Sequence, residues 1–169
     1  MKKINVGLIG FGTIGAGVAK ILAENQEVIQ KRLGAAVCLA KIADLDITTD
    51  RGIVVNDGVL TTSVDDIIEN PEIDIVIELI GGYEPARTLI LKALKNNKHV
   101  VTANKALLAK HGDELFETVE EKGLSIGFEA SIGGAIPIIR SIREGFVANR
   151  IQAIEGIVNG TANYILSKM

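Results

Sequence analysis

The chain has 169 residues, 47% of them apolar and 23% charged, which is enough to bury one sizeable core. Its formal net charge of -3, with no basic face along the sequence, argues against binding to nucleic acid or to an anionic membrane. The single cysteine, Cys38, excludes an intramolecular disulfide, and the short apolar run after Met1 fits neither a signal peptide nor a membrane helix, so we expect a cytoplasmic protein.

In the first third of the chain, two hydrophobic periodicities alternate. Continuous apolar runs predict strands buried on both faces, as in a parallel sheet, whereas apolar residues three and four apart predict amphipathic helices. In chain order, they predict a strand at residues 4–9, one long helix from Thr13 to Gly34, a strand at 37–43 that ends at Asp44, and a short strand at 53–55 after a polar loop.

The same alternation continues as far as residue 128. The segment Ser63 to Asp66 resembles a capping box with aspartate in place of glutamate, and it predicts a short helix that Pro71 ends. The patterns that follow predict a strand at 73–80, a helix that Pro85 begins, a strand at 100–101, a helix through 107–119 that Gly123 stops, and a strand at 124–128. Such alternation with short connections predicts a doubly wound, mainly parallel α/β sheet of the Rossmann type.

The glycine pair Gly133-Gly134 marks a change of pattern, and we predict a domain boundary near Ser131. Residues 1–130 would form a dinucleotide-binding domain, and residues 131–169 would begin a second, α+β domain. The elements expected in this second part are a helix from Pro137 to about Val147, an apolar stretch at 151–158 and a helix from Thr161. The final apolar helical turn has no stop signal, so we expect the complete protein to continue beyond it.

The sequence Gly10-Phe11-Gly12-Thr13-Ile14-Gly15 is a Gly-x-Gly-x-x-Gly motif that follows the first predicted strand and opens the first predicted helix. A dinucleotide fingerprint requires this context, and without it the motif would be a weak signal. Gly10 would turn the chain, Gly12 would let the backbone approach a pyrophosphate, and Gly15 would let the helix pack closely on the strand. The alternative is a tight turn without a ligand. We interpret all six residues as a cofactor-binding site, with the helix N-terminus facing the phosphates.

Asp44, at the end of the second predicted strand, can accept hydrogen bonds from an adenosine ribose and would repel a 2′-phosphate, which favours NAD over NADP. Two observations weaken this preference. Asp44 lies farther from the glycine motif than the usual spacing of about 20 residues, and Arg51 in the next loop could meet a phosphate. A solvated aspartate at the edge of a loop is the alternative interpretation.

Two further segments follow predicted strands and therefore belong to the carboxyl edge of the sheet, where open α/β domains bind ligands. The pair Gly81-Gly82 can let a nicotinamide approach the backbone, although a plain glycine loop is the alternative. In the segment Thr102-Ala103-Asn104-Lys105, Lys105 could orient a carbonyl or hydroxyl group, hold a substrate charge or exchange a proton. Our candidates for cofactor contact in these segments are Gly81, Gly82, Thr102 and Lys105.

A metal site has little support from the residues themselves. His99 and His111 have no second histidine or cysteine at ligand spacing. Glu129 follows the last predicted strand and precedes Gly133-Gly134, so it could hold a hard cation together with loop carbonyl groups. For Glu129, a simple hydrogen-bonding role is the interpretation that composition favours.

Six blocks of sequence, taken together, are far more specific than the glycine motif alone. They are Gly10–Gly15, Glu78–Gly82, Val101–Leu108, Phe128–Gly134, Ile136–Arg140 and Gly156–Leu166. Through these blocks the chain resembles the homoserine dehydrogenase family along almost its whole length. The resemblance implies reversible hydride transfer between NAD(P)H and L-aspartate 4-semialdehyde, giving L-homoserine on the route to threonine, methionine and isoleucine. It also implies that the full-length protein is a homo-oligomer.

The resemblance further implies roles for particular residues. Phe11, Thr13 and Ile14 would lie beside the cofactor, and Lys105 would be a catalytic or orienting group near the nicotinamide and the substrate. Gly160 and Thr161 would border the active site. A sodium ion would be held by the side chain of Glu129 and by the backbone carbonyl groups of Ile132, Gly134 and Ile136.

The chain departs from the family pattern in three respects. Ala43 stands where many members have an arginine before the strand-end aspartate, which strengthens the case for NAD. Ala162 replaces a common threonine. The family's second catalytic lysine and its acidic substrate-binding residues come after the last residue of this chain. We therefore expect the chain to bind the cofactor but to turn over little substrate.

Two other functions remain open at this point. One is another Rossmann-type reductase acting on an aldehyde or an amino acid, which would share the glycine motif but lack the Thr-Ala-Asn-Lys block that ends at Lys105. The other is a non-catalytic dinucleotide-binding or regulatory module, which a substrate domain in a longer gene product would exclude.

Overall fold

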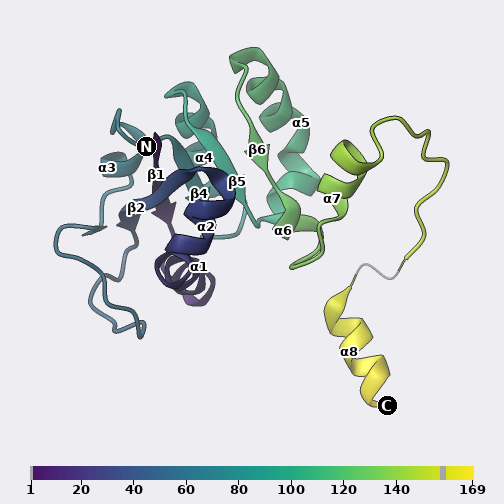
Figure 1. Ribbon diagram of the computed structural model, residues 1–169, viewed down its shortest axis with the longest axis horizontal. Coiled ribbons are helices and arrows are strands. Elements are labelled where there is room, and N and C mark those ends of the chain that lie inside the picture. Colours follow the sequence, from purple (N-terminus) through teal and green to yellow (C-terminus); the bar gives the residue numbers. More distant parts are fainter. Residues whose placement is uncertain (1, 157–158) are drawn as a thin grey trace. The chain divides into compact units, whose positions relative to one another are not determined.

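The predicted parallel sheet forms in the first of the two units into which the chain divides, Met1–Phe128 and Glu129–Met169. The computed structural model describes residues 2–156 and 159–169. In this part of the chain, six strands pair in parallel in the order β3-β2-β1-β4-β5-β6 (Figure 1). The strands are β1 (Lys2–Ile9), β2 (Ala35–Ala43), β3 (Leu60–Thr61), β4 (Ile75–Glu78), β5 (His99–Thr102) and β6 (Ile126–Gly127).

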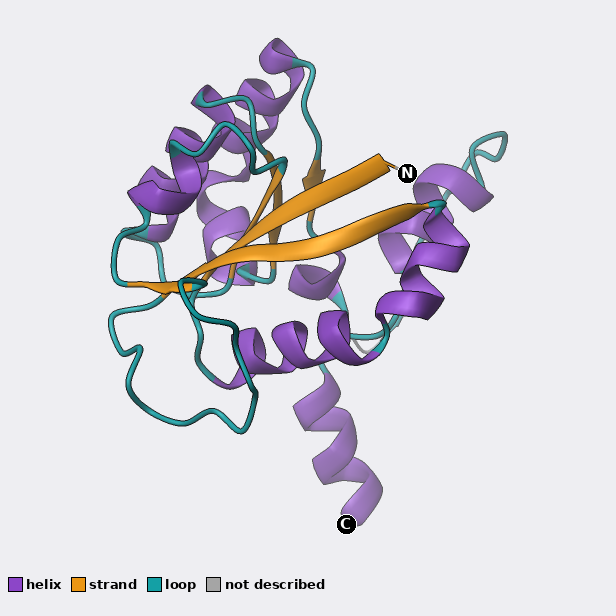
Figure 2. Cartoon of the chain, turned by 60° about the vertical axis from the view of Figure 1, so that its left-hand side comes forward, coloured by secondary structure: helices purple, strands orange, loops and turns teal. Residues whose placement is uncertain are grey.

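Helices lie on both faces of this sheet (Figure 2). They are α1 (Thr13–Glu24), α2 (Gln26–Leu33), α3 (Asp65–Ile68), α4 (Ala86–Lys95) and α5 (Lys105–Lys122). Residues of α1 belong to one buried hydrophobic cluster, and residues of α3, α4 and α5 belong to a second cluster. This is the doubly wound α/β arrangement that the alternation of strands and helices predicts, and the prediction is confirmed.

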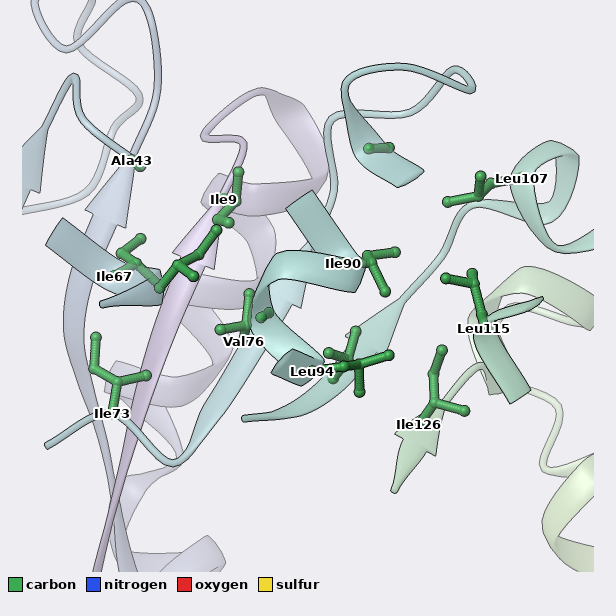
Figure 3. Packing of buried hydrophobic residues seen from close by; sticks show 14 residues of the cluster. Ile9, Ala43, Ile67, Ile73, Val76, Ile90, Leu94, Leu107, Leu115 and Ile126 are labelled. Atoms are coloured by element: carbon green, nitrogen blue, oxygen red, sulfur yellow. The ribbon is translucent and has the colours of Figure 1, made fainter. Parts of the chain in front are cut away.

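The two hydrophobic clusters divide between the faces of the central strand β1. Side chains alternate along a strand, so the neighbours Leu8 and Ile9 point to opposite faces. Leu8 packs with Ile42 and with Ala19 of α1, whereas Ile9 belongs to the cluster that includes Val76 (Figure 3). Burying each large aliphatic side chain contributes roughly 1.5–3 kcal/mol. Packing on both faces therefore fixes the position of the end of β1, and with it the position of Gly10, the next residue.

The strand order places a ligand crevice at the end of β1. This strand pairs with β2 on one side and with β4 on the other, so the connections that follow β1 and β3 lead to opposite halves of the sheet. Open α/β sheets bind ligands at this switch point, outside the carboxyl ends of the strands. The turn after β1, the end of β2 and the loop after β4 all meet there.

The long helix predicted from Thr13 to Gly34 is in fact two helices. Helix α1 ends at Glu24, and Asn25, with φ -106° and ψ 17°, separates it from α2. The backbone N–H and the side-chain amide of Asn25 both donate hydrogen bonds to the carbonyl group of Ile21, at 3.0 and 3.2 Å. The backbone bond is the ordinary helical bond to the residue four positions earlier, and the side-chain bond shares its acceptor at the point where α1 ends. Helical spacing of apolar residues nevertheless continues beyond the break.

Two local predictions between β2 and α3 are wrong. Residues 53–55 form no strand, and the strand that pairs with β2 is β3, at Leu60–Thr61. Ser63 does not cap α3, because the N-cap residue is Val64 and its side chain makes no capping hydrogen bond. The hydroxyl group of Thr61 instead donates to Asp66 (2.6 Å), so the acidic residue of the expected capping box bonds to the end of β3.

The second unit contains short helices in its described residues. They are α6 (Glu129–Ile132), α7 (Ile138–Arg140), the π-helical turn η1 (Ser141–Gly145) and α8 (Gly160–Lys168). The boundary predicted near Ser131 falls inside α6. The helix expected from Pro137 to Val147 corresponds to α7 and η1 in succession. The side chain of Asn159 caps α8 by accepting a hydrogen bond from the N–H of Ala162 (2.8 Å).

The apolar stretch predicted at residues 151–158 is only partly described. Residues 151–156 have no regular secondary structure, and Ile157 and Val158 lie outside the described residues. Among the helices that are described, none has the length and apolar character needed to cross a membrane.

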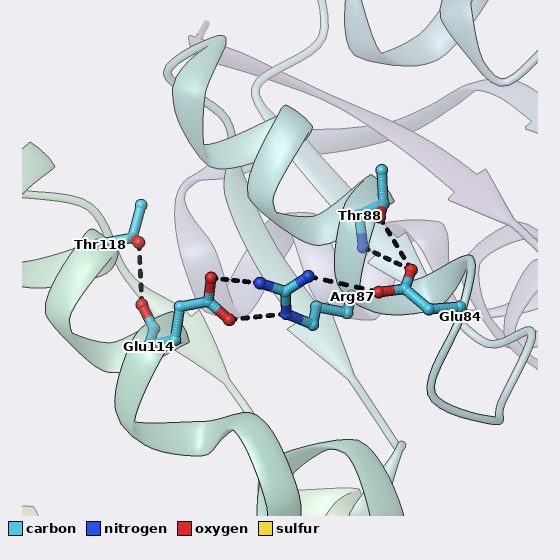
Figure 4. A network of polar contacts seen from close by, with 5 residues as sticks. All are labelled: Glu84, Arg87, Thr88, Glu114 and Thr118. Atoms are coloured by element: carbon cyan, nitrogen blue, oxygen red, sulfur yellow. Dashed lines mark hydrogen bonds and ion pairs between the residues drawn. The ribbon is translucent and has the colours of Figure 1, made fainter.

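A network of charged and polar side chains joins α4 to α5 (Figure 4). Arg87 of α4 forms two hydrogen bonds to the carboxylate of Glu114 on α5, at 2.6 and 2.5 Å. It also contacts Glu84 at 3.3 Å, and Glu84 accepts a bond from the hydroxyl group of Thr88 (2.8 Å). The paired, planar geometry of an arginine and a carboxylate is the strongest form of such a contact. The network therefore holds the helix that begins at Lys105 against α4.

Replacement of Glu114 by glutamine is expected to lower the free energy of unfolding at neutral pH. The hydrogen bonds from Arg87 hold the pKa of the Glu114 carboxyl below its ordinary value of 4.5. A lowered pKa stabilises the fold above the ordinary value, and the stabilisation is lost as the pH falls through the pKa of the folded state. Urea unfolding of the variant and the unsubstituted chain, at neutral pH and in steps below pH 4.5, should show the difference shrinking on acidification.

The control for this prediction is Glu117→Gln, an exposed residue of the same helix α5, which removes the same charge. It should leave the unfolding free energy nearly unchanged at every pH. An equal effect of the two substitutions would show that net charge, and not the contact with Arg87, is responsible.

Candidate functional site

The glycine motif forms a tight turn between β1 and α1. Gly10 has a φ of 99°, and its N–H donates a hydrogen bond to the carbonyl group of Ala43 (2.9 Å), which ties the turn to β2. A Cβ atom at Gly10 would lie 2.9 Å from the backbone of Leu79, and one at Gly15 would lie 2.0 Å from the carbonyl oxygen of Gly10. The fold therefore requires glycine at both positions, independently of any ligand.

The middle glycine of the motif has a different environment. Gly12 is exposed, and a Cβ atom added to it would meet nothing within 4 Å. It is the N-cap residue of α1, and no side chain caps the helix. The first N–H groups of a helix have no partner within the helix, and the helix dipole adds partial positive charge there. Gly12 thus leaves open a space in which a phosphate would meet backbone donors.

Asp44 connects the end of β2 to the glycine turn. One carboxylate oxygen accepts a hydrogen bond from the N–H of Phe11 (2.5 Å), and the other accepts from the N–H of Asp46 (2.9 Å). The side chain is half-buried, so it is not simply a solvated residue at the edge of a loop. Each carboxylate oxygen can accept more than one hydrogen bond, which leaves acceptor capacity for ribose hydroxyl groups.

A cleft of about 400 Å³ opens at the carboxyl ends of β1, β2 and β4. Gly10, Gly12 and Asp44 contribute to its lining, and Leu79 and Ile80 form part of its apolar wall. Its volume lies within the range of about 300–1,000 Å³ that is common for small-molecule sites. The structure thus brings the glycine motif and Asp44, which lie far apart in the sequence, to one cleft.

A second, smaller cleft of about 160 Å³ lies toward β5. Ile14 and Gly81 line it, together with Ala103 and Asn104. Lys105 is the exposed first residue of α5, and its side chain makes no hydrogen bond or ion pair within the described ranges. The predicted residues at the glycine pair and at Lys105 therefore belong to the segments that follow the neighbouring strands β4 and β5, at the carboxyl edge of the sheet.

The structure shows two buried polar residues that the sequence reasoning did not select. Glu78 is 1% exposed, and its carboxylate bonds to the hydroxyl group of Thr102 (2.7 Å). Asn104 is 7% exposed, and its side chain caps α5. Thr102 itself, predicted to contact the cofactor, is 1% exposed and lies behind the cleft surface. The available signal for Glu78 was a charged residue inside the predicted strand at 73–80, with three apolar residues before it and two after it.

Arg51 lies outside the cleft that Asp44 lines. Its guanidinium group pairs with Asp46 at 3.1 Å, and it faces a separate groove that also contains Thr13 and Lys20. Hydrogen bonds from Thr49 and Thr48 hold the pKa of the Asp46 carboxyl far below its usual range, so Asp46 remains a charged partner for Arg51 at neutral pH.

Glu129, in the second unit, already has two backbone partners. Its carboxylate oxygens accept hydrogen bonds from the N–H groups of Ile139 (2.8 Å) and Arg140 (3.1 Å), at the start of α7. The carbonyl group of Ile136, a predicted sodium ligand, accepts a bond from the N–H of Ile138 (2.8 Å). Hydrogen bonding therefore accounts for Glu129, and the sodium site with Ile132, Gly134 and Ile136 stays a prediction of the resemblance. The described residues contain no cluster of three or more histidine, cysteine or acidic residues that could hold a metal ion.

Two family models match the chain. The model described as homoserine dehydrogenase, NAD binding domain, matches residues 10–129. The model described as homoserine dehydrogenase matches residues 137–169. The first of these matches includes the glycine motif, Lys105 and every residue that lines the two clefts except Ile9.

Similar proteins and structures agree with these matches. The chain is 48% identical to a homoserine dehydrogenase of Pseudomonas aeruginosa and 46% identical to one of Bacillus subtilis. Both alignments cover 100% of this chain, but they cover only 38% of the Pseudomonas protein and 39% of the Bacillus protein. A crystal structure of a homoserine dehydrogenase from Thiobacillus denitrificans superposes with a TM-score of 0.91 at 48% identity, covering 100% of this chain and 39% of that one. The chain thus spans about two fifths of the length of the relatives it matches.

Proposed function

The chain belongs to the homoserine dehydrogenase family, and on this premise we propose that it is the part of such an enzyme that binds the nicotinamide dinucleotide and presents it to the substrate. The reaction we propose for the whole enzyme is the interconversion of L-homoserine and L-aspartate 4-semialdehyde. Family membership argues against the other Rossmann-type reductases, and the Thr-Ala-Asn-Lys block that they should lack is present.

One observation carries the proposal from this chain's own residues. Gly12 leaves an open space at the N-terminus of α1, beside a cleft that Asp44 lines on the other side. The pyrophosphate would bind at the helix N-terminus and the adenosine ribose at Asp44, which directs the nicotinamide toward Gly81 and Lys105. When bound, the dinucleotide supplies or accepts the hydride. The residues of this chain hold it and orient the reacting carbonyl or hydroxyl group.

A chimeric enzyme would test the proposed reaction. This chain would replace the matching segment of the Pseudomonas aeruginosa relative, which would supply the rest of the protein. We expect the chimera to reduce NAD⁺ when L-homoserine is added, as followed by the absorbance of the reduced nicotinamide. A folded chimera that binds NAD⁺ but never oxidises L-homoserine would support the alternative of a non-catalytic dinucleotide-binding module.

For the choice of cofactor, we propose that NAD is preferred over NADP. Asp44 places negative charge where a 2′-phosphate would lie, Ala43 offers no cation beside it, and Arg51 is paired with Asp46 in another groove. We also propose a cytoplasmic, homo-oligomeric enzyme, and a sodium site at Glu129 that would have to share its carboxylate with the two N–H groups of α7.

Replacement of Asp44 by asparagine should reverse part of this preference. The amide keeps the size of the side chain but removes its charge and one of the two oxygens that accept backbone bonds from Phe11 and Asp46. Ribose hydroxyl groups therefore lose a charged acceptor, and a 2′-phosphate is no longer repelled. We expect affinity for NAD⁺ to fall by roughly tenfold and affinity for NADP⁺ to rise. Calorimetric titration with both nucleotides measures the two changes, and Asp57→Asn, at an exposed site away from the clefts, controls for the loss of one charge. A parallel fall for both nucleotides would contradict the proposed role of Asp44.

A further inference from the structure

Three buried polar side chains lie where β4 and β5 end. Glu78 and Thr102 are each 1% exposed, and Asn104 is 7% exposed. Glu78 and Thr102 are partners in the register of the two strands, so their side chains start from adjacent positions. Buried polar groups of this kind destabilise a fold unless they are hydrogen-bonded, and a fully bonded set specifies one arrangement.

The carboxylate of Glu78 fixes the loop that follows its own strand. One of its oxygens accepts hydrogen bonds from the N–H groups of Ile80 (2.9 Å) and Gly81 (3.1 Å). Its other oxygen accepts from the hydroxyl group of Thr102 (2.7 Å). Glu78 thus bonds at once to the loop after β4 and to the last residue of β5.

Asn104 closes the connection from the other side. Its backbone N–H donates to the hydroxyl oxygen of Thr102 (3.0 Å), and its side-chain amide donates to the carbonyl group of Gly82 (2.6 Å). Its side-chain oxygen accepts a bond from the N–H of Leu107 (3.1 Å) and so caps the helix on which Lys105 is the first residue. The bonds form a ring that runs from Glu78 through Thr102 and Asn104 and back to the loop.

This ring lies directly behind the smaller cleft, which Glu78 and Asn104 help to line together with Gly81. The other cleft residues, Gly12 and Asp44, belong to the turn after β1 and to the end of β2 and take no part in the ring. Loss of the ring should therefore affect the two halves of the cofactor cleft differently.

We propose that Glu78 is a positioning residue for the nicotinamide half of the cofactor. It acts through Thr102 and Asn104, and it keeps the Ile80–Gly82 loop and Lys105 at a fixed separation. This inference rests on the proposed dinucleotide-binding function and adds to it a residue that does not itself need to touch the ligand. Without the carboxylate, two loop N–H groups and one hydroxyl group lose their common acceptor, so the loop and the start of α5 would no longer be held together.

The test compares two ligands on this chain. NADH carries the nicotinamide, whereas ADP-ribose has the adenosine, the pyrophosphate and the second ribose but no nicotinamide. Affinities for both would be measured by calorimetry for the unsubstituted chain, for Glu78→Ala and for Glu78→Gln. Glu114→Gln serves as the control, because it removes a bond between α4 and α5 without touching either cleft.

We expect Glu78→Ala to bind NADH roughly tenfold more weakly, with affinity for ADP-ribose changed by less than about twofold. Glu78→Gln, which keeps one acceptor oxygen, should fall between Glu78→Ala and the unsubstituted chain. Glu114→Gln should leave the ratio of the two affinities unchanged.

Two results would overturn this proposal and leave the proposed dinucleotide-binding function intact. They are an equal loss of both ligands in folded Glu78→Ala, which would mean a merely structural role, and unchanged NADH affinity in that variant. If Glu78→Ala fails to fold, Glu78→Gln decides the question by the same ratio. If the unsubstituted chain bound neither NADH nor ADP-ribose, the proposed function itself would fail, and this inference with it.

Discussion

Replacement of Gly12 by valine is expected to weaken NAD⁺ binding by more than about a hundredfold while the chain stays folded. A Cβ atom at this position meets no protein atom within 4 Å, so the side chain would occupy the space left for the pyrophosphate. Without that approach, the N–H groups at the start of α1 cannot reach the phosphates, and several charge-assisted hydrogen bonds are lost together. The measurement is calorimetric titration with NAD⁺, accompanied by urea unfolding.

The stability of the Gly12→Val chain should fall by no more than about 1 kcal/mol, because valine is a poorer N-cap residue than glycine. Gly17→Val is the matched control, since Gly17 also lies on α1, is exposed and has open space beside it. The control should bind NAD⁺ almost as well as the unsubstituted chain. Normal binding by Gly12→Val would rule out a pyrophosphate at this turn.

Replacement of Lys105 by methionine should lower kcat of the chimeric enzyme by about 10²–10⁴-fold, the range typical for loss of a group that transfers or directs a proton. Lys105 is exposed at the start of α5, without an ion-pair partner among the described residues, so its ammonium group is available to a substrate. Methionine keeps an unbranched side chain that is one atom shorter, and it removes the charge. Steady-state oxidation of L-homoserine gives kcat and KM separately.

The control for this substitution is Lys122→Met, at the other end of α5. It should leave kcat within about twofold of the starting value, as is usual for a surface change away from special contacts. A Lys105→Met enzyme with an ordinary kcat but a raised KM would assign Lys105 to substrate binding only. An enzyme with both constants unchanged would remove Lys105 from the site.

The order of strands and helices could be predicted from the sequence because it depends on local periodicity. Buried parallel strands have continuous apolar runs, and the strands at residues 2–9 and 35–43 end where the glycine turn and Asp44 begin. The prediction failed where apolar side chains are buried without belonging to a strand. Ile53 and Val55 pack against the hydrophobic cluster around Leu8, but residues 53–55 form no strand. Their apolar character therefore predicted a strand that is absent from the fold.

The break at Asn25 illustrates a second limit. Helical spacing of apolar residues continues past it, so periodicity predicts one helix. The break lies at Asn25, where the backbone leaves the helical conformation and the side-chain amide bonds to the carbonyl group of Ile21, and a pattern of apolar residues does not contain this contact.

In the candidate site, too, one part could be predicted from the sequence and another part could not. The glycine turn is a contiguous motif with known backbone requirements, and the contacts at Gly10 and Gly15 are those that the motif predicts. The ring around Glu78 could not be predicted from spacing, because its bonds join residues that lie 24 and 22 positions apart in the chain. Only the fold brings the ends of β4 and β5 together.

The most direct test of the central claim is a nuclear magnetic resonance titration of the ¹⁵N-labelled chain with NAD⁺. Binding at the proposed site predicts saturable shifts of the amide signals of residues 10–15, Asp44, the 80–82 loop and the 102–105 segment, with little change elsewhere. Shifts confined to another part of the surface, or a folded chain whose spectrum does not respond to excess NAD⁺, would contradict the account.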